Sequence, residues 1–383
     1  MSPAPRCWGA VLQNATLVAG GLVVSVLLLE LGLRLFAPLS PSWSQPDDTL
    51  GWAFIPHAAY RFVAPEGCPG WTSSGQINSH GLRDREYPYA KPPGTYRILA
   101  LGDSYTEGLQ HDLDHIWPKL LEQRLNQRGG DMRYEVINGG RSGMGTGLEY
   151  LFYTSRGRRY AADLVVLLVI GNDVEDNSAA FREPGGYGPY FSLDGDALVV
   201  DDSFKRERAY WVRSVLTPLK QRSALVSYVL RQYYVFVNWR AQTSGAAVSV
   251  GARAAGAAEV ETPVVAPYSP AIVQAVAVTQ RLLVELNEAV RADGARLVVF
   301  NGSRETWDPA QPDALVRAVA NEQHLAYLDL IPPMEAAAAR SGTLMFGCRE
   351  NGGGGHWSRA GQATAAALIY EFLESSGVLP AER

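Results

Sequence analysis

The chain has 383 residues, of which 47% are hydrophobic, so it is long enough for one large domain with extensions. Its 34 Lys and Arg against 39 Asp and Glu leave a net charge of −5, which offers no general attraction to a polyanion. The sequence also has no zinc-finger spacing and no Gly-Lys-Ser/Thr phosphate loop. We therefore expect no nucleic-acid partner.

An apolar segment near the N-terminus is long enough to cross a membrane. Residues 15–29 read ATLVAGGLVVSVLLL without a charge, and the apolar character continues to Phe36. Glu30 and Arg34 interrupt only the far end, where long side chains can reach toward the interface. Because a bilayer core requires about 20 such residues, we predict a transmembrane anchor over residues 15–36, after a short cytoplasmic segment, residues 1–14.

A cleaved signal peptide is the alternative reading of this segment. The expected cut after Ala37 has Leu35 two residues earlier and Pro38 directly after it, which makes a poor processing site. Arg6 precedes the apolar span and Asp47 follows it, which favours an N-terminus inside the cytoplasm. We therefore expect a single-pass membrane protein whose main domain is extracytoplasmic, in the periplasm or at the cell surface.

The three cysteines are compatible with this topology. Cys7 would face the cytoplasm, whereas Cys68 and Cys348 would share a compartment that can be oxidising. A Cys68–Cys348 disulfide and two unpaired thiols both remain open at this point.

A regular alternation of strands and helices begins after a lead-in segment, residues 37–96, which is rich in Pro, Gly and aromatic residues. Five short apolar runs have the character of buried strands, and stretches with helical spacing separate them. The predicted strands are 96–102, 134–139, 162–171, 295–302 and 325–330; the predicted helices are 116–128, 147–157, 270–292, 309–323 and a last one after His356. This pattern predicts a three-layer α/β/α domain over residues 97–383, with a roughly five-stranded parallel sheet.

Residues 180–268 interrupt the alternation and are interpreted as an insertion. They contain a Gly/Pro/Tyr-rich loop, an aromatic stretch over 210–240 and a low-complexity, Ala- and Gly-rich connector. The aromatic stretch is compatible with covering a substrate cleft, lying on the membrane surface, or packing against the main domain.

Three residues stand out directly after the first three predicted strands, where functional groups gather in parallel sheets. Ser104 follows the first strand in ALGDSYTEG, although Asp and Ser are also the usual helix N-caps there. Gly143 follows the second strand in NGGRSGMG, where the dinucleotide-binding spacing is absent and glycine permits close approach of a backbone N–H. Asn172 follows the third strand in IGNDVEDN, where an Asn-Asp turn is the alternative.

Taken together, these motifs resemble those of the SGNH (GDSL-type) hydrolase superfamily. The segments GDSYTEG, GRSG, GND and GHW carry the resemblance, which runs from about Ile77 to the end with the insertion outside it. The resemblance implies a flavodoxin-like sheet, and the apolar N-terminus is similar to that of a bacterial, membrane-anchored branch.

The resemblance also implies roles for the named residues. Ser104 would be the nucleophile and His356 the general base. The Ser104 N–H, the Gly143 N–H and the Asn172 side chain would form the oxyanion hole. No metal or cofactor is implied, and the substrate would be an acylated small molecule, glycan or lipid. Deacylation by water makes an esterase or deacetylase, and deacylation by a sugar hydroxyl makes a carbohydrate O-acyltransferase.

The chain departs from the family pattern just before the histidine. Family members carry an aspartate two or three residues earlier, where this chain has Gly354 and Gly353. Glu350, Asp329 and Asp173 are alternative acids, and the sequence does not rank them.

Two consequences of the missing aspartate remain open. Backbone carbonyls of residues 352–355 could orient the His356 ring and leave a slower Ser-His dyad. Alternatively, the site has decayed, and the domain is a membrane-anchored pseudo-hydrolase that binds an acylated glycan or lipid without cleaving it. Loss of a correctly placed acid costs up to ~10⁴ in turnover in serine hydrolases.

Overall fold

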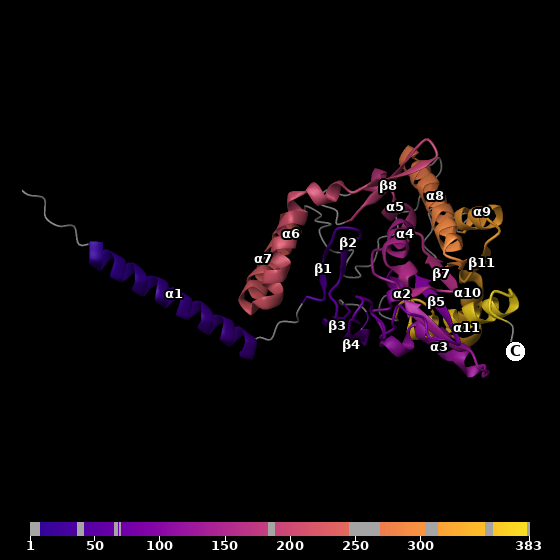
Figure 1. The fold of residues 1–383 in the computed structure, drawn as a ribbon, viewed down its shortest axis with the longest axis horizontal. Helices are drawn as coiled ribbons and strands as arrows, with labels where there is room; N and C mark the ends of the chain where they lie inside the picture. Colours follow the sequence, from indigo (N-terminus) through magenta and orange to yellow (C-terminus); the bar gives the residue numbers. More distant parts are fainter. Residues whose placement is uncertain are drawn as a thin grey trace, which may run out of the picture. The chain divides into compact units, whose positions relative to one another are not determined.

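The computed structural model describes the chain in eight stretches (Figure 1). These are residues 8–36, 42–64, 68, 70–182, 188–244, 269–302, 313–348 and 355–380. They belong to two compact units, which are described separately. The first unit draws on Met1–Ser42 and Arg213–Val248, and the second on Trp43–Val212 and Ser249–Arg383.

The second unit is built on a five-stranded sheet with the order β11-β10-β7-β5-β6, in which all neighbouring strands are parallel. The strands are β5 (Thr95–Leu101), β6 (Arg133–Asn138), β7 (Leu164–Val169), β10 (Arg296–Asn301) and β11 (Ala326–Asp329). These are the five strands predicted from the apolar runs. The first strand of the sheet, β5, lies between the second and the third, so the strand order reverses at β5, where open α/β sheets place their ligands.

Helices cover both faces of this sheet, as Figure 1 shows for α3 and α11 on one side and α4 and α8 on the other. The helices are α3 (Trp117–Gln127), α4 (Thr146–Ser155), α8 (Pro270–Ala292), α9 (Ala314–Glu322), α10 (Ile331–Ser341) and α11 (Arg359–Ser375). Successive strand side chains point to opposite faces. Ile98 and Ala100 of β5 therefore pack toward α3 and α11, whereas Leu99 and Leu101 pack toward α4 and α8. The prediction of an α/β/α domain is confirmed.

The lead-in segment forms two antiparallel hairpins, and the residues after the second hairpin (77–94) then run to the first strand of the sheet. The hairpins pair β1 (Ser44–Asp47) with β2 (Gly51–Phe54) and β3 (Ala59–Val63) with β4 (Thr72–Gln76). In this segment, Arg83 is 1% exposed and donates to the backbone oxygens of Glu107 and His111. Asp84, also buried, forms an ion pair with Lys119 at 2.8 Å. These contacts join the lead-in to residues just beyond Ser104.

A disulfide also ties the lead-in to the C-terminal part of the domain. Cys68 and Cys348 are bonded, with their Cα atoms 5.6 Å apart and a separation of 280 positions in sequence. The sequence left open whether these two cysteines form a disulfide or remain as thiols, and in the structure they form the disulfide.

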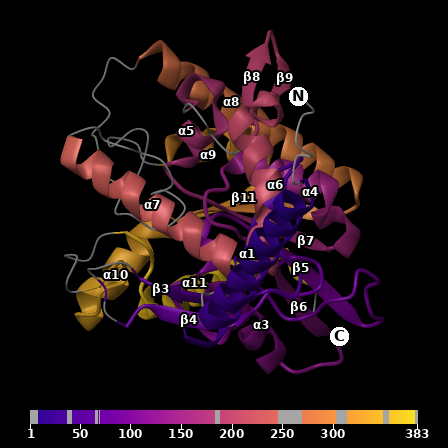
Figure 2. The same cartoon turned by 90° about the vertical axis from the view of Figure 1, so that its left-hand side faces the viewer.

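The insertion begins with a hairpin and continues into helices. β8 (Tyr190–Asp194) pairs with β9 (Ala197–Asp201) and lies beside α8 (Figure 2), where Phe191 packs on Val278 and Leu282. The aromatic stretch then forms α6 (Arg208–Arg222) and α7 (Ala224–Ser244). The low-complexity connector lies outside the described residues.

In the first unit, the apolar N-terminal segment forms one helix, α1 (Trp8–Phe36). Its segment Leu12–Phe36 is long and apolar enough to cross a membrane, and a signal sequence passes the same test.

Candidate active site

Ser104 lies at the turn between β5, which stands next to the edge strand β6, and a single helical turn, α2 (Ser104–Glu107). The strand ends at Leu101, and Asp103 caps the following turn because its Oδ1 accepts the Tyr105 N–H at 2.8 Å. The Asp103 and Tyr105 side chains are buried, whereas Ser104 is partly exposed. The nucleophile candidate is therefore presented at the carboxyl edge of the sheet on a rigid, capped turn.

The structure brings Ser104 and His356 together from positions 252 residues apart. The distance between His356 Nε2 and Ser104 Oγ is 2.7 Å. The Ser104 hydroxyl also faces Asp103 Oδ2 at 3.0 Å, so its single proton has two acceptors within reach. A ring nitrogen at this distance has the geometry that removal of the serine proton requires.

His356 is placed by a short antiparallel contact that precedes α11. Phe346 and Trp357 form an isolated β-bridge. The Gly347 N–H donates to the His356 carbonyl at 2.7 Å, and the Ser358 N–H donates to the Met345 carbonyl at 2.8 Å. The disulfide-bonded Cys348 follows Gly347 directly, so the covalent tie to the lead-in lies next to the residue that pairs with His356.

Two aromatic rings pack around the His356 side chain. The Tyr105 ring stacks on the His356 ring with 4.9 Å between centroids, and the Trp357 indole packs edge-on against Tyr105. The fully buried Trp357 donates its indole N–H to the carbonyl of Gly302, which follows β10. Sequence reasoning missed Tyr105, because only the fold brings it under a histidine 251 positions later.

The turn that carries Gly143 is fastened to the turn that carries Ser104. Glu107 Oε2 accepts the Ser142 N–H at 2.5 Å and also the Ser142 hydroxyl. A Cβ on Gly140 would lie 2.6 Å from the Glu107 nitrogen, so only glycine permits this approach. Gly143 itself has φ +72°, in the left-handed region that glycine favours.

Two backbone N–H groups on the turns after β5 and β6 are available as donors. Within the described part of the chain, neither the Ser104 N–H nor the Gly143 N–H donates to an acceptor. Gly143 follows β6, and β6 is the direct neighbour of β5 in the sheet. Both donors thus belong to turns at the same edge of the sheet.

Asn172 follows β7, the neighbour of β5 on its other side. Its Nδ2 donates to Asp176 Oδ2 at 2.9 Å, which uses one of the two amide protons. The Asn172 Oδ1 is buried and has no hydrogen-bond partner among the described residues. One amide N–H remains for an acceptor that is not part of this arrangement.

The three acids that the sequence offered as partners of the histidine occupy different environments. Asp329 Oδ1 accepts from the Asn301 side chain and the Ile331 N–H, each at 3.0 Å, so it serves the start of α10. Asp173 is fully buried and accepts from the Thr146 hydroxyl at 3.3 Å. Glu350 and the glycines at 352–354 lie outside the described residues.

A cluster of buried carboxyl groups lies beneath the serine and asparagine turns. Burial raises the pKa of Glu149 and of Asp173 well above the usual carboxyl range, and the neighbouring charge of Asp103 raises both further. Burial likewise raises the pKa of Glu107. Both Glu149 oxygens lack a hydrogen-bond partner among the described residues. Glu149 therefore keeps its proton to a higher pH in the folded chain than a carboxyl group in water does.

The described residues contain no group of three or more His, Cys, Asp or Glu side chains arranged to hold a metal ion. The turns at this edge of the sheet carry a serine hydroxyl, two backbone N–H groups and an amide, and His356 brings its imidazole to the serine. Such a set can carry acyl transfer, because it combines a nucleophile, a base and donors for a developing negative charge.

A protein-family model matches more than half of the chain. The model of the GDSL-like Lipase/Acylhydrolase family matches residues 100–364. Comparison with curated protein sequences gives no match.

Several solved structures are similar to the chain at low sequence identity. The crystal structure of TesA is 16% identical and covers 74% of this chain and 99% of its own, with a TM-score of 0.40. The acetyl xylan esterase AlAXEase is 11% identical and covers 73% and 98%, with a TM-score of 0.38. The lipase/acylhydrolase from Enterococcus faecalis is 14% identical and covers 73% and 96%, with a TM-score of 0.38.

Proposed function

Because the chain belongs to the GDSL-like lipase/acylhydrolase family, we propose that it cleaves carboxylic esters through an acyl-Ser104 intermediate. The observation that carries this proposal is the 2.7 Å distance between His356 Nε2 and Ser104 Oγ. It supports a working nucleophile and base over a decayed binding site, because a site released from catalysis has no need to keep this pair in hydrogen-bonding distance.

In the proposed first step, Ser104 Oγ attacks the ester carbonyl while His356 Nε2 takes the hydroxyl proton. The carbonyl oxygen becomes negatively charged in the tetrahedral intermediate. The N–H groups of Ser104 and Gly143 and the remaining Asn172 amide proton would donate to it. His356 then returns the proton to the leaving alcohol, and the acyl group stays on Ser104.

In the second step, water attacks the acyl-serine with His356 as the base, and a carboxylic acid is released. Stacking on Tyr105 holds the imidazole ring over the serine during both steps. The ring orientation, which an aspartate fixes elsewhere in the family, is here supported by Tyr105 and by the backbone bond from Gly347.

We place the hydrolase outside the cytoplasm, anchored by α1, with envelope glycans or lipids as substrates. The Cys68–Cys348 bridge supports this location, since disulfides persist in oxidising compartments. Retention of α1 is supported by its contacts with the rest of the first unit: Glu30 and Arg34 bind residues 222–225, and cleavage would remove both partners.

The test is hydrolysis of a short p-nitrophenyl ester combined with labelling by a fluorophosphonate. Wild type should turn over the ester and carry the label on Ser104, as read by peptide mass spectrometry. Ser104→Ala should lose both, whereas the matched variant Ser375→Ala, at the exposed end of α11, should keep both. Ester turnover that survives Ser104→Ala would overturn the mechanism.

A further inference from the structure

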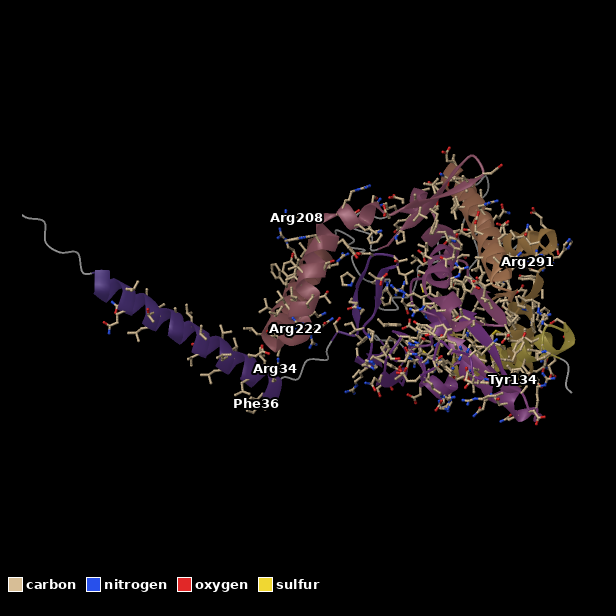
Figure 3. All side chains as sticks on the ribbon, in the orientation of Figure 1. Arg34, Phe36, Tyr134, Arg208, Arg222 and Arg291 are labelled. Carbon is tan, nitrogen blue, oxygen red and sulfur yellow. A yellow bond between two sulfur atoms is a disulfide. The ribbon has the colours of Figure 1, made fainter. Side chains whose placement is uncertain are left out.

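The two charged residues near the end of α1 bind the start of α7. Glu30 accepts hydrogen bonds from the Ser223 hydroxyl and from the N–H groups of Ala224 and Leu225, each at 2.9 Å. Arg34 pairs with Glu30 at 2.7 Å and donates to the Arg222 carbonyl at 2.6 Å. Figure 3 shows Arg34 and Arg222 next to each other at this junction. Glu30 therefore caps α7, where a negative charge complements the positive end of the helix dipole.

The position of Glu30 in the span fixes the depth of this junction. The 25 residues from Leu12 to Phe36 measure about 37 Å as a helix, whereas a bilayer's hydrocarbon core is about 30 Å thick. With the span centred, Arg34 lies at the edge of the core and Glu30 about 6 Å inside it. An ionisable group there is costly unless it has partners. Its partners lie at the start of α7, and Arg34 binds the end of α6, so both helix ends also lie at the membrane boundary.

From this junction α7 runs across α1 instead of alongside it. Figure 1 shows α1 along its length and α7 foreshortened, and Figure 2 shows the reverse. A helix that starts at the end of a membrane-spanning helix and runs across it has the direction of an interfacial helix.

The exposed side of α7 has the chemistry of that surface. Val229, Tyr233 and Phe236 are 55%, 60% and 53% exposed and follow a spacing of four and three residues, which places them on one helical face. Tyrosines are enriched where a membrane meets water, because one end of the ring is apolar and the other polar.

The charge of this segment is the opposite of the charge of the whole chain. Residues 213–244 contain five Lys and Arg and no Asp or Glu, in a protein with a net charge of −5. The described basic side chains include Arg231 and Arg240, both exposed on α7. Basic residues beside an apolar helical face bind surfaces of anionic lipid.

We infer that α7 is a second membrane contact, an interfacial helix that binds anionic lipid and is fixed to the anchor by Glu30. The inference rests on the proposed anchoring by α1. It means that the insertion is attached to the bilayer at two places, through the span and through the face of Val229, Tyr233 and Phe236. The partner is the bilayer that holds α1 and not a second protein, because the Glu30 junction already places the helix at its boundary.

The test uses an environment-sensitive NBD fluorophore on single cysteines of the full chain, reconstituted in phosphatidylcholine vesicles with or without phosphatidylglycerol. Cys7→Ser removes the free thiol, and the disulfide protects the other two cysteines. Val229→Cys probes α7. Val273→Cys, on α8 and 56% exposed, is the matched aqueous control. Leu22→Cys, in the middle of α1, is the bilayer reference.

The label at Val229 should be blue-shifted and several-fold less quenched by iodide than the label at Val273, with the larger effect in phosphatidylglycerol. Arg231→Gln should weaken the dependence on phosphatidylglycerol, and Glu30→Ala should return the Val229 label toward water while the Leu22 label stays shielded. Equal quenching at Val229 and Val273, with Leu22 shielded, overturns the interfacial helix and leaves the anchor standing. Quenching at Leu22 overturns the anchor and the inference with it, whereas the ester assay on the same samples reports separately on the hydrolase.

Discussion

The serine side and the histidine side of the candidate site are held in place by different means. Ser104 follows β5, and two contacts fix its turn: the Asp103 cap and the hydrogen bond between Glu107 and Ser142, which lies on the turn after the neighbouring strand β6. His356 comes from a loop region, and distant parts of the chain hold it. These are the Tyr105 ring and the disulfide from Cys348 to Cys68. The sheet itself thus positions the proposed nucleophile, whereas the proposed base depends on cross-links added around the sheet.

The largest expected effect comes from the histidine itself. His356→Ala should lower kcat for p-nitrophenyl ester hydrolysis by about 10⁴ or more, because no other imidazole takes the serine proton. The fold should persist, since the partly exposed ring is not part of either hydrophobic core. Steady-state kinetics and circular dichroism check this together. A folded variant with near-normal kcat would show that another group is the base.

The disulfide tests whether the histidine side depends on its cross-link. Cys348→Ser and Cys68→Ser each open the same 280-residue connection, so each should cost roughly 2–5 kcal/mol in the free energy of unfolding. Each should also lower kcat/KM, even when the assay temperature is well below the unfolding temperature of the variant. The reason is that Gly347, next to Cys348, pairs with His356. Urea unfolding and ester kinetics measure the two effects. The double variant should be no worse than either single one, and Cys7→Ser should change nothing.

Loss of the hydrogen bonds between Glu107 and Ser142, which join the two turns on the serine side, should lower the rate less. Glu107→Ala removes the acceptor for Ser142 N–H, so the neighbouring Gly143 turn loses its fixed position. Loss of one oxyanion donor costs about 10²–10³ in kcat, and a displaced donor should cost about 10–100-fold. Glu107→Gln keeps an acceptor oxygen and should lose less. Equal kcat for wild type and Glu107→Ala would separate this turn from catalysis.

The buried carboxyl cluster gives the smallest effect, on stability and not on rate. Glu149 keeps its proton in the folded chain at a pH where the unfolded chain has released it, because burial raises its folded pKa. The stability that it contributes is thus complete below the unfolded value near 4.5 and is lost as the pH rises through the folded pKa. Glu149→Gln has no proton to release, so its stability should fall less between about pH 5 and about pH 8. Each pKa unit by which the folded value exceeds the unfolded one corresponds to about 1.4 kcal/mol in the free energy of unfolding.

Thermal unfolding followed across this pH range checks the prediction. The exposed Glu371→Gln on α11 is the control and should keep the pH dependence of wild type. A Glu149→Gln curve parallel to the wild-type curve would show that Glu149 titrates alike in the folded and unfolded chains.

The sequence alone determined the sheet, the apolar N-terminal helix and the residues at the strand ends. Buried parallel strands are continuous apolar runs, and their carboxyl ends share one edge, so Ser104, Gly143 and Asn172 could be placed there from local pattern. Local pattern could not place the contacts of His356 with Ser104 and Tyr105, because they join residues more than 250 positions apart and leave no periodic signal; only the family resemblance implied the pairing with Ser104. The role of Glu30 is likewise not visible in the sequence, where it is only a charged residue that interrupts an apolar segment. Only the packing of α1 against the start of α7 makes it a helix cap.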